Sequence, residues 1–344
     1  MVKLNPHLLR SGIAALIVLF LTPLPHHAQS STVAGGDERS RGIALYSQGN
    51  DKAAAAALNS AVKKDKTDFQ AWYFLGLAQV RLEKLKEATK SLENAVRLQP
   101  DFSAAHLALS YMALLRNKHD EAVRKARLVL AKEPGSAEAH HIIGVVRLRE
   151  NYREEALKES EIAIRLSPQF APGYLLKSQA QVSFVSFAPV AGRIESTDEM
   201  QSRFIEAAGA LERFLQLEPN AKNKETWLKQ LESLRFHATP ADKRSEAEQV
   251  YSGKEVTSKA RVTAKPEPRY TEQARNQQTT GTVVLRCVFA ADRTVKYLLV
   301  VVGLPDGLTE RALEAARRIK FEPAIKDGRP VSMYVQLEYN FNLY

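Results

Sequence analysis

The pattern of hydrophobic and polar residues changes along the chain from a helical period to a strand period. Over most of the first 236 residues, apolar positions follow the spacing of amphipathic helices. From Val331 to Phe341, apolar residues alternate with polar or amphipathic ones, which predicts one long, half-buried strand. The chain therefore combines a large helical region with a smaller region that contains strands.

The helical region repeats every 34 residues, and in the clearest unit, residues 71–100, small residues alternate with large apolar ones. Small side chains let two antiparallel helices approach closely, and a proline ends the second helix. The unit resembles the tetratricopeptide (TPR) pattern at Trp72, Leu75, Gly76, Ala88, Leu92, Ala95 and Pro100. The residues on the 34-residue grid include Pro100, Pro134, Pro168, Ala88, Ala122 and Ala156.

This period predicts an all-helical TPR solenoid over residues 35–236. The last repeat is lengthened by residues 183–199, and the helix at 225–236 is expected to cap the solenoid. The five expected units are residues 35–68, 69–102, 103–136, 137–170 and 171–219.

The TPR resemblance implies a protein-binding scaffold whose inner surface comes from the first helix of each unit. Some TPR domains carry a Lys/Asn clamp there for a C-terminal carboxylate, but the residue types in this chain cannot form one. They suit a hydrophobic peptide or self-association; alternatively, they pack on the neighbouring repeat. The six expected groove residues are Tyr73, Leu77, Leu107, Tyr111, His141 and Val145.

A polar segment at 237–258 is expected to be a linker, and the pattern after it predicts a ββαβ domain at 259–344. Strands are expected at 282–289 and 294–302, and a helix at 308–319, with one face against the strands. The expected fold class is thus α plus α+β: a helical solenoid followed by a small ββαβ domain.

Three stretches of this domain resemble the C-terminal domain of TonB-type energy transducers: "PRYTEQAR" (268–275), "LTERALEAARRIKFEPA" (308–324) and "DGRPV" (327–331). The resemblance implies binding of a short extended segment of an outer-membrane transporter. It also implies force transmission from a proton-driven motor in the inner membrane. The chain departs from the family at Thr271, where proline is common, and it has the TPR array in place of a long Pro-rich spacer.

The last strand can lie at an edge of its sheet, because no later strand has to pair with it. Glu338 is its only charged side chain after Pro330, so neither charge nor proline protects such an edge. We therefore expect a partner strand to add there through main-chain hydrogen bonds; alternatively, the linker or a second copy covers the edge. The expected binding residues are Val331, Ser332, Met333, Tyr334, Val335, Gln336 and Leu337, together with Tyr270.

The N-terminus has the layout of a secretory signal: Lys3 and Arg10 precede an apolar run, and Ala28 marks a plausible cleavage point. This predicts a signal peptide at 1–28 and a periplasmic protein. The alternative is an uncleaved inner-membrane anchor formed by residues 11–24, which N-terminal sequencing of the mature protein would distinguish.

Neither the motifs nor the charge of the chain predict catalysis, a cofactor, a metal site or nucleic-acid binding. The sequence has no HExxH, GxSxG, GxGxxG or CxxC motif, and His106 and His140 share their period with no other ligand type. The net charge is +10, yet no basic run exceeds two residues. The single cysteine, Cys287, is expected to be a buried apolar residue.

These observations predict a non-enzymatic, exported binding protein of a Gram-negative-type envelope. Its expected partner is an outer-membrane transporter or another envelope protein. Two alternatives stay open at this point: a TonB-type energy transducer for nutrient uptake that is anchored in the inner membrane and coupled to its motor, and a structural assembly factor that forms a homodimer.

Overall fold

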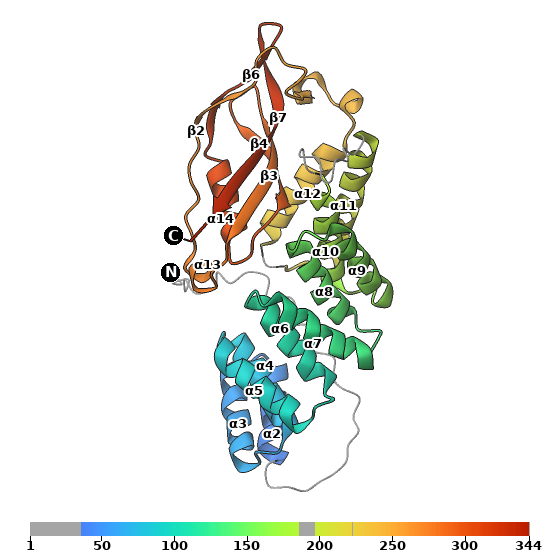
Figure 1. Cartoon of the computed structure of the whole chain (residues 1–344), viewed down its shortest axis with the longest axis vertical. Helices are drawn as coiled ribbons and strands as arrows, with labels where there is room; N and C mark the ends of the chain where they lie inside the picture. Colours follow the sequence, from blue (N-terminus) through green and yellow to red (C-terminus); the bar gives the residue numbers. More distant parts are fainter. Residues whose placement is uncertain (1–35, 186–196, 222, 344) are drawn as a thin grey trace. The chain divides into compact units, whose positions relative to one another are not determined.

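The computed structural model describes residues 36–185, 197–221 and 223–343 (Figure 1). The expected signal peptide lies outside these residues, as does most of the 183–199 insertion. The described residues form two compact units, one of residues 36–150 and 162–168, the other of residues 151–161 and 169–343. In the described part of the chain, no helix is both long and apolar enough to cross a membrane.

The helical region is a solenoid, as the 34-residue period predicted (Figure 1). In the described chain its helices follow one another as five pairs and a final single helix. They are α2 (Gly36–Ser47), α3 (Asp51–Lys64), α4 (Phe69–Arg81), α5 (Leu85–Leu98), α6 (Ser103–Leu115), α7 (His119–Lys132), α8 (Ala137–Arg149), α9 (Arg153–Leu166), α10 (Ala171–Ser183), α11 (Thr197–Leu217) and α12 (Lys224–Ala238).

Small residues set how closely the paired helices approach. A Cβ atom added at Gly76 would lie 2.7 Å from Cγ of Leu92 and 3.3 Å from the carbonyl oxygen of Ala88. Gly42 meets Leu58 in the same way one repeat earlier, at 2.5 Å. A larger side chain at these glycines would force the helices apart, which is why the small positions recur with the repeat.

Positive backbone φ angles also recur every 34 residues, which the sequence analysis did not predict. The turn between paired helices places one residue with positive φ at Gly49, Glu83, Asn117 and Asn151, with φ angles of 77°, 62°, 53° and 67°. Glycine and asparagine accept this left-handed conformation easily, but Glu83 does not. Because Glu83 is not a typical turn residue, the four positions do not form a recognisable pattern of turn residues in the sequence.

The C-terminal domain contains, within the described residues, a five-stranded sheet of order β1–β7–β3–β4, with β6 paired to β7. Strand β7 runs antiparallel to β3 along the whole of β3, from Gly281↔Phe341 to Phe289↔Met333. The strands are β1 (Val250–Tyr251), β3 (Gly281–Phe289), β4 (Val295–Val302), β6 (Ala324–Lys326) and β7 (Arg329–Phe341). The remaining elements are β2 (Arg261–Ala264), which pairs with β5 (Lys320–Glu322), and the helices α13 (Glu272–Asn276) and α14 (Leu308–Ala316).

One face of the sheet packs on α14, as the alternation in the last strand predicted. Leu337, Tyr339 and Phe341 of β7 are buried in one cluster with Leu308, Ala312 and Ala315 of α14. Cys287 of β3 is fully buried in the same core, and burial raises the pKa of its thiol. The thiol is therefore a packing group rather than a reactive one.

The other face of the sheet is covered as well, which the sequence analysis did not predict. Leu299 and Val301 of β4 are 1% and 5% exposed because they pack in one cluster with helices α10, α11 and α12. The end of the solenoid and the sheet thus share a hydrophobic core within one compact unit. The residues that α11 and α12 place in this cluster include Leu211, Phe214, Leu231 and Leu234.

Candidate functional site

The outer edge of β7 is occupied at its N-terminal end. Strand β1 pairs with it in parallel at Ser332 and Met333, and residues 329–331 form a hairpin with β6. Strand β1 lies within the segment expected to be a linker, where two residues are too few to give a strand pattern. A strand from the expected linker therefore covers the start of β7. Four of the predicted binding residues, from Tyr334 to Leu337, lie beyond the covered stretch.

From Tyr334 to Phe341, no strand among the described residues pairs with the outer side of β7. The Glu338 carbonyl oxygen accepts a hydrogen bond from Nζ of Lys265, at 2.8 Å. Backbone groups two residues apart face the same side of a strand, so Gln336 and Tyr334 share the orientation of Glu338. This side of β7 thus presents a row of main-chain groups that no described strand covers.

The side chains of β7 divide between the two faces of the sheet. Met333 and Leu337 are buried, whereas Val331 and Val335 are half-buried. The hydroxyl of Ser332 accepts a hydrogen bond from the Ala291 amide at 3.2 Å. These residues hold the strand in place, and at the edge the main chain, not these side chains, points outward.

Tyr334 makes its side-chain contacts within the protein, on the face turned toward α12. Its hydroxyl oxygen accepts a hydrogen bond from Arg244, whose guanidinium group also donates to the carbonyls of Phe236 and Thr239 at 3.0 and 2.8 Å. The rings of His237 and Tyr334 lie 5.6 Å apart, and the guanidinium carbon of Arg286 lies 5.0 Å from the Tyr334 ring. This aromatic and cationic cluster fixes the start of the open edge.

Burial determines the protonation states of His237 and Arg286 in this cluster. Burial lowers the pKa of His237 well below its usual value, and the nearby positive charge of Arg286 lowers it further. Burial also lowers the pKa of Arg286 to about 10, which leaves that side chain charged at neutral pH. His237 is therefore neutral in the folded protein at neutral pH.

Tyr270 lies at the far end of β7. Its ring packs edge-on against Phe341 with the ring centres 5.5 Å apart, and its hydroxyl donates to the carbonyl of Thr279 at 2.9 Å. The structure therefore places Tyr270 beside the end of the strand, not beside the residues from Tyr334 to Leu337. A direct role in binding stays a prediction.

The residues predicted to line the solenoid groove are mostly buried. Tyr73 is 4% exposed and packs edge-on against Phe102 at 4.9 Å, and Tyr111 is 6% exposed within a cluster of α6, α7 and α8. Val145 is half-buried. The other three, Leu77, Leu107 and His141, are 4%, 8% and 5% exposed.

These residues therefore do not form an open groove in the structure. Tyr73 and Tyr111 pack in clusters that join helices of successive repeats, so these two side chains lie between repeats. Burial also lowers the pKa of His141 to about 4. Binding of a partner at these positions stays a prediction, and it would require the repeats to separate.

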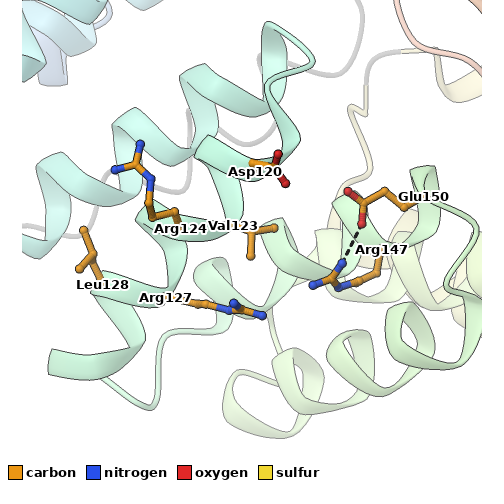
Figure 2. A pocket seen from close by; sticks show the side chains of 7 residues that line it. All are labelled: Asp120, Val123, Arg124, Arg127, Leu128, Arg147 and Glu150. Atoms are coloured by element: carbon orange, nitrogen blue, oxygen red, sulfur yellow. Dashed lines mark hydrogen bonds and ion pairs between the residues drawn. The ribbon is translucent and has the colours of Figure 1, made fainter.

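An exposed hollow of about 490 Å³ lies instead between α7 and α8 (Figure 2). Arg147 forms an ion pair with Glu150 at 2.7 Å, whereas Arg124 and Arg127 are exposed and form no ion pair with the described residues. Figure 2 shows Arg127 and Arg147 extending toward the hollow from the two helices. Its lining residues are Asp120, Val123, Arg124, Arg127, Leu128, Arg147 and Glu150.

The fold defines a class of protein: a helical repeat scaffold joined to a small domain with a partly open sheet edge. Residues 39–89 and 75–137 match the tetratricopeptide repeat family model. Residues 266–343 match the model of the Gram-negative bacterial TonB protein C-terminal domain. Neither family is catalytic, and the two matches indicate a protein-protein interaction scaffold with a role related to the bacterial envelope.

Solved structures similar to this chain are TPR proteins. MamA from Desulfovibrio magneticus RS-1 is 17% identical, with a TM-score of 0.43, over 55% of this chain and 97% of that one. TTC0263, a thermophilic TPR protein from Thermus thermophilus, is 19% identical, with a TM-score of 0.45, over 59% of this chain and 99% of that one. No curated protein matches the chain.

Sequence reasoning missed Arg244 and Lys265, which contact β7 from outside the predicted strands and helices. Both lie in polar stretches without a periodic pattern, so only the fold brings them to the edge. In the described part of the chain, no group of three His, Cys, Asp or Glu side chains is arranged to hold a metal ion.

Proposed function

We propose that this is a non-enzymatic, periplasmic binding protein whose C-terminal sheet takes an extended segment of an outer-membrane transporter. The segment adds as a strand to the outer edge of β7 between Tyr334 and Phe341. The observation that carries the proposal is this open edge, which offers main-chain groups without a strand partner among the described residues. The match to the TonB C-terminal domain supports it.

Strand addition fits the chemistry of this edge. Main-chain hydrogen bonds supply affinity with little dependence on side chains. An incoming strand displaces the Nζ of Lys265 from the Glu338 carbonyl, an exchange of one exposed hydrogen bond for another. The hydrogen bonds of Arg244 to Tyr334 and to the Thr239 carbonyl hold Tyr334 in place during this exchange. The strand is therefore ordered before the partner binds.

A proline at Gln336 tests the proposal because it removes an outward N–H while the residue stays on an edge strand. In the full chain, Gln336→Pro is expected to weaken binding of a synthetic transporter segment by about tenfold or more, since it removes one main-chain hydrogen bond and obstructs its neighbour. Isothermal titration measures the dissociation constant.

Gln336→Ala is the matched control, because it truncates the same side chain but keeps the N–H. Its affinity is expected to equal that of the unmodified protein. Equal affinities for the proline and alanine variants would show that strand addition does not use this part of β7.

For the solenoid, we propose that the hollow between α7 and α8 binds an acidic segment with apolar side chains. Arg124 and Arg127 supply positive charge and form no ion pair with a carboxylate of the described residues, and Leu128, 48% exposed, supplies an apolar contact. Arginine forms bidentate pairs with carboxylates, so acidic residues fit this surface best.

Reversal of this charge is the test. The double variant Arg124→Glu/Arg127→Glu is expected to weaken binding of an Asp- and Leu-containing peptide by about tenfold, and the effect should shrink at high salt. Fluorescence anisotropy of the labelled peptide gives the affinity. A control, Lys52→Glu/Lys63→Glu, changes the net charge equally on α3; an equal loss of affinity there would mean that the attraction is not localised in the hollow.

A further inference from the structure

Strand β4 forms the other edge of the sheet, and a side chain of α12 occupies it. Nε2 of Gln230 donates to the carbonyl oxygen of Leu298 at 2.9 Å, and Oε1 of the same side chain accepts from the amide of Val300 at 2.8 Å. The hydroxyl of Ser233, one turn further along α12, also donates to the Leu298 carbonyl, at 3.3 Å. These bonds join positions about 70 residues apart in the sequence.

The geometry of this contact is that of a strand. In a parallel pair, one residue donates its N–H to the residue before its partner and accepts from the residue after it. The Gln230 carboxamide does the same toward Leu298 and Val300, the two residues that flank Leu299. A side-chain amide carries the same donor and acceptor as a peptide group, so it can replace one residue of an added strand.

The site is buried and built for this contact. Gln230 is 5% exposed and Ser233 is 3% exposed, so both polar side chains need partners there. Phe236 of α12 stacks on Tyr297 of β4 with ring centres 3.7 Å apart and planes 5° from parallel. The α12 helix thus covers both the edge and part of one face of β4.

The sequence of β4 explains why the edge has to be closed. Residues 297–302 read YLLVVV, because one face of the strand packs toward α14 and the other toward α10–α12. An apolar edge strand without proline pairs readily with another strand. Lys296, the charged residue that precedes this run, is tied to Asp292 at 2.6 Å.

We propose that Gln230 acts as a strand mimic that closes the β4 edge and so restricts strand addition to β7. When the α12 contact is lost, the competing occupant is β4 of a second copy of this chain. The outward groups of Leu298 and Val300 lie symmetrically about Leu299, so two copies can pair antiparallel across a two-fold axis there. The inference does not depend on the identity of the partner at β7.

Hydrogen–deuterium exchange at the Val300 amide, measured in the full chain, tests whether Gln230 closes the β4 edge. Gln230→Ala is expected to accelerate exchange of this amide by about tenfold, the value of one lost hydrogen bond. Lys229→Ala, a change at an exposed neighbour on the same helix, is expected to leave it unchanged.

Gln230→Glu separates a hydrogen-bonding role from mere packing. A protonated carboxyl has one donor and one acceptor like the amide, whereas a carboxylate only accepts and repels the Leu298 carbonyl. Either form keeps an acceptor for the Val300 amide, so Val300 should stay protected in this variant after correction for intrinsic exchange. Gln230→Met, which has a similar shape but no acceptor of this kind, should lose the protection. Unchanged exchange in Gln230→Ala, or equal protection in Gln230→Met and the wild type, would overturn the mimic.

Sedimentation velocity tests whether β4 of a second copy pairs with β4 when the α12 contact is lost. Gln230→Ala/Ser233→Ala is expected to shift the full chain from monomer toward dimer as its concentration rises. Addition of Val300→Pro, which removes the outward N–H, should restore the monomer. A double variant that exchanges fast at Val300 yet stays monomeric would overturn pairing between copies, and a dimer that persists with the proline would place the contact elsewhere.

Discussion

Replacement of Tyr111 by alanine is expected to lower the free energy of unfolding of the solenoid by about 3–5 kcal/mol, and Tyr73→Ala by a similar amount, the range for buried aromatic side chains. Both tyrosines are almost fully buried between helices of successive repeats. Urea unfolding followed by far-ultraviolet circular dichroism measures the change.

This result distinguishes packing from a binding groove. Groove residues would leave stability nearly unchanged when truncated, whereas residues that fill the space between repeats leave a cavity. Tyr152→Ala, at a position that is 52% exposed, is the control and should change stability far less. A small loss for both Tyr73→Ala and Tyr111→Ala would restore the groove interpretation.

Acidification is expected to destabilise the solenoid because His141 is buried in its neutral form. Burial, and then the charge of Arg149, lower its pKa to about 4, whereas an unfolded histidine has a pKa of about 6.5. Between these two pH values the unfolded chain binds more protons than the folded chain. The free energy of unfolding therefore falls as the pH is lowered, by on the order of 2 kcal/mol from pH 7 to pH 4.5. Urea unfolding at several pH values measures this slope.

The variant His141→Gln should lose this part of the pH dependence, whatever its effect on stability at neutral pH. His237 in the other compact unit has its pKa lowered in the same direction, so His141→Gln/His237→Gln should reduce the slope further. Identical slopes for the wild type and both variants would show that other groups cause the acid sensitivity.

The two edges of the C-terminal sheet are treated differently by the fold. On β4, buried amide and hydroxyl groups of α12 satisfy the outward backbone. On β7, an exposed lysine holds one carbonyl beyond the stretch that pairs with β1. In the proposed strand addition, the weaker closure at β7 makes this edge the preferred one for an incoming strand.

The sequence by itself determined the helix pairs and the long C-terminal strand. The period of 34 at Ala88, Ala122 and Ala156 identified the close contacts between helices, because only small residues fit there. The alternation in β7 identified its buried face, because side chains of a strand point to opposite sides in turn. Both patterns can be read along the chain without knowing which segments meet in space.

Only the tertiary structure decided which surfaces stay open. Tyr73 and Tyr111 suit either a groove or the space between repeats, and the period does not say which neighbour covers them. The Gln230 contact joins residues about 70 positions apart, and neither partner has a pattern that points to the other. Burial and edge pairing depend on which elements meet in space, so a reading of local patterns could predict the elements but not the site between them.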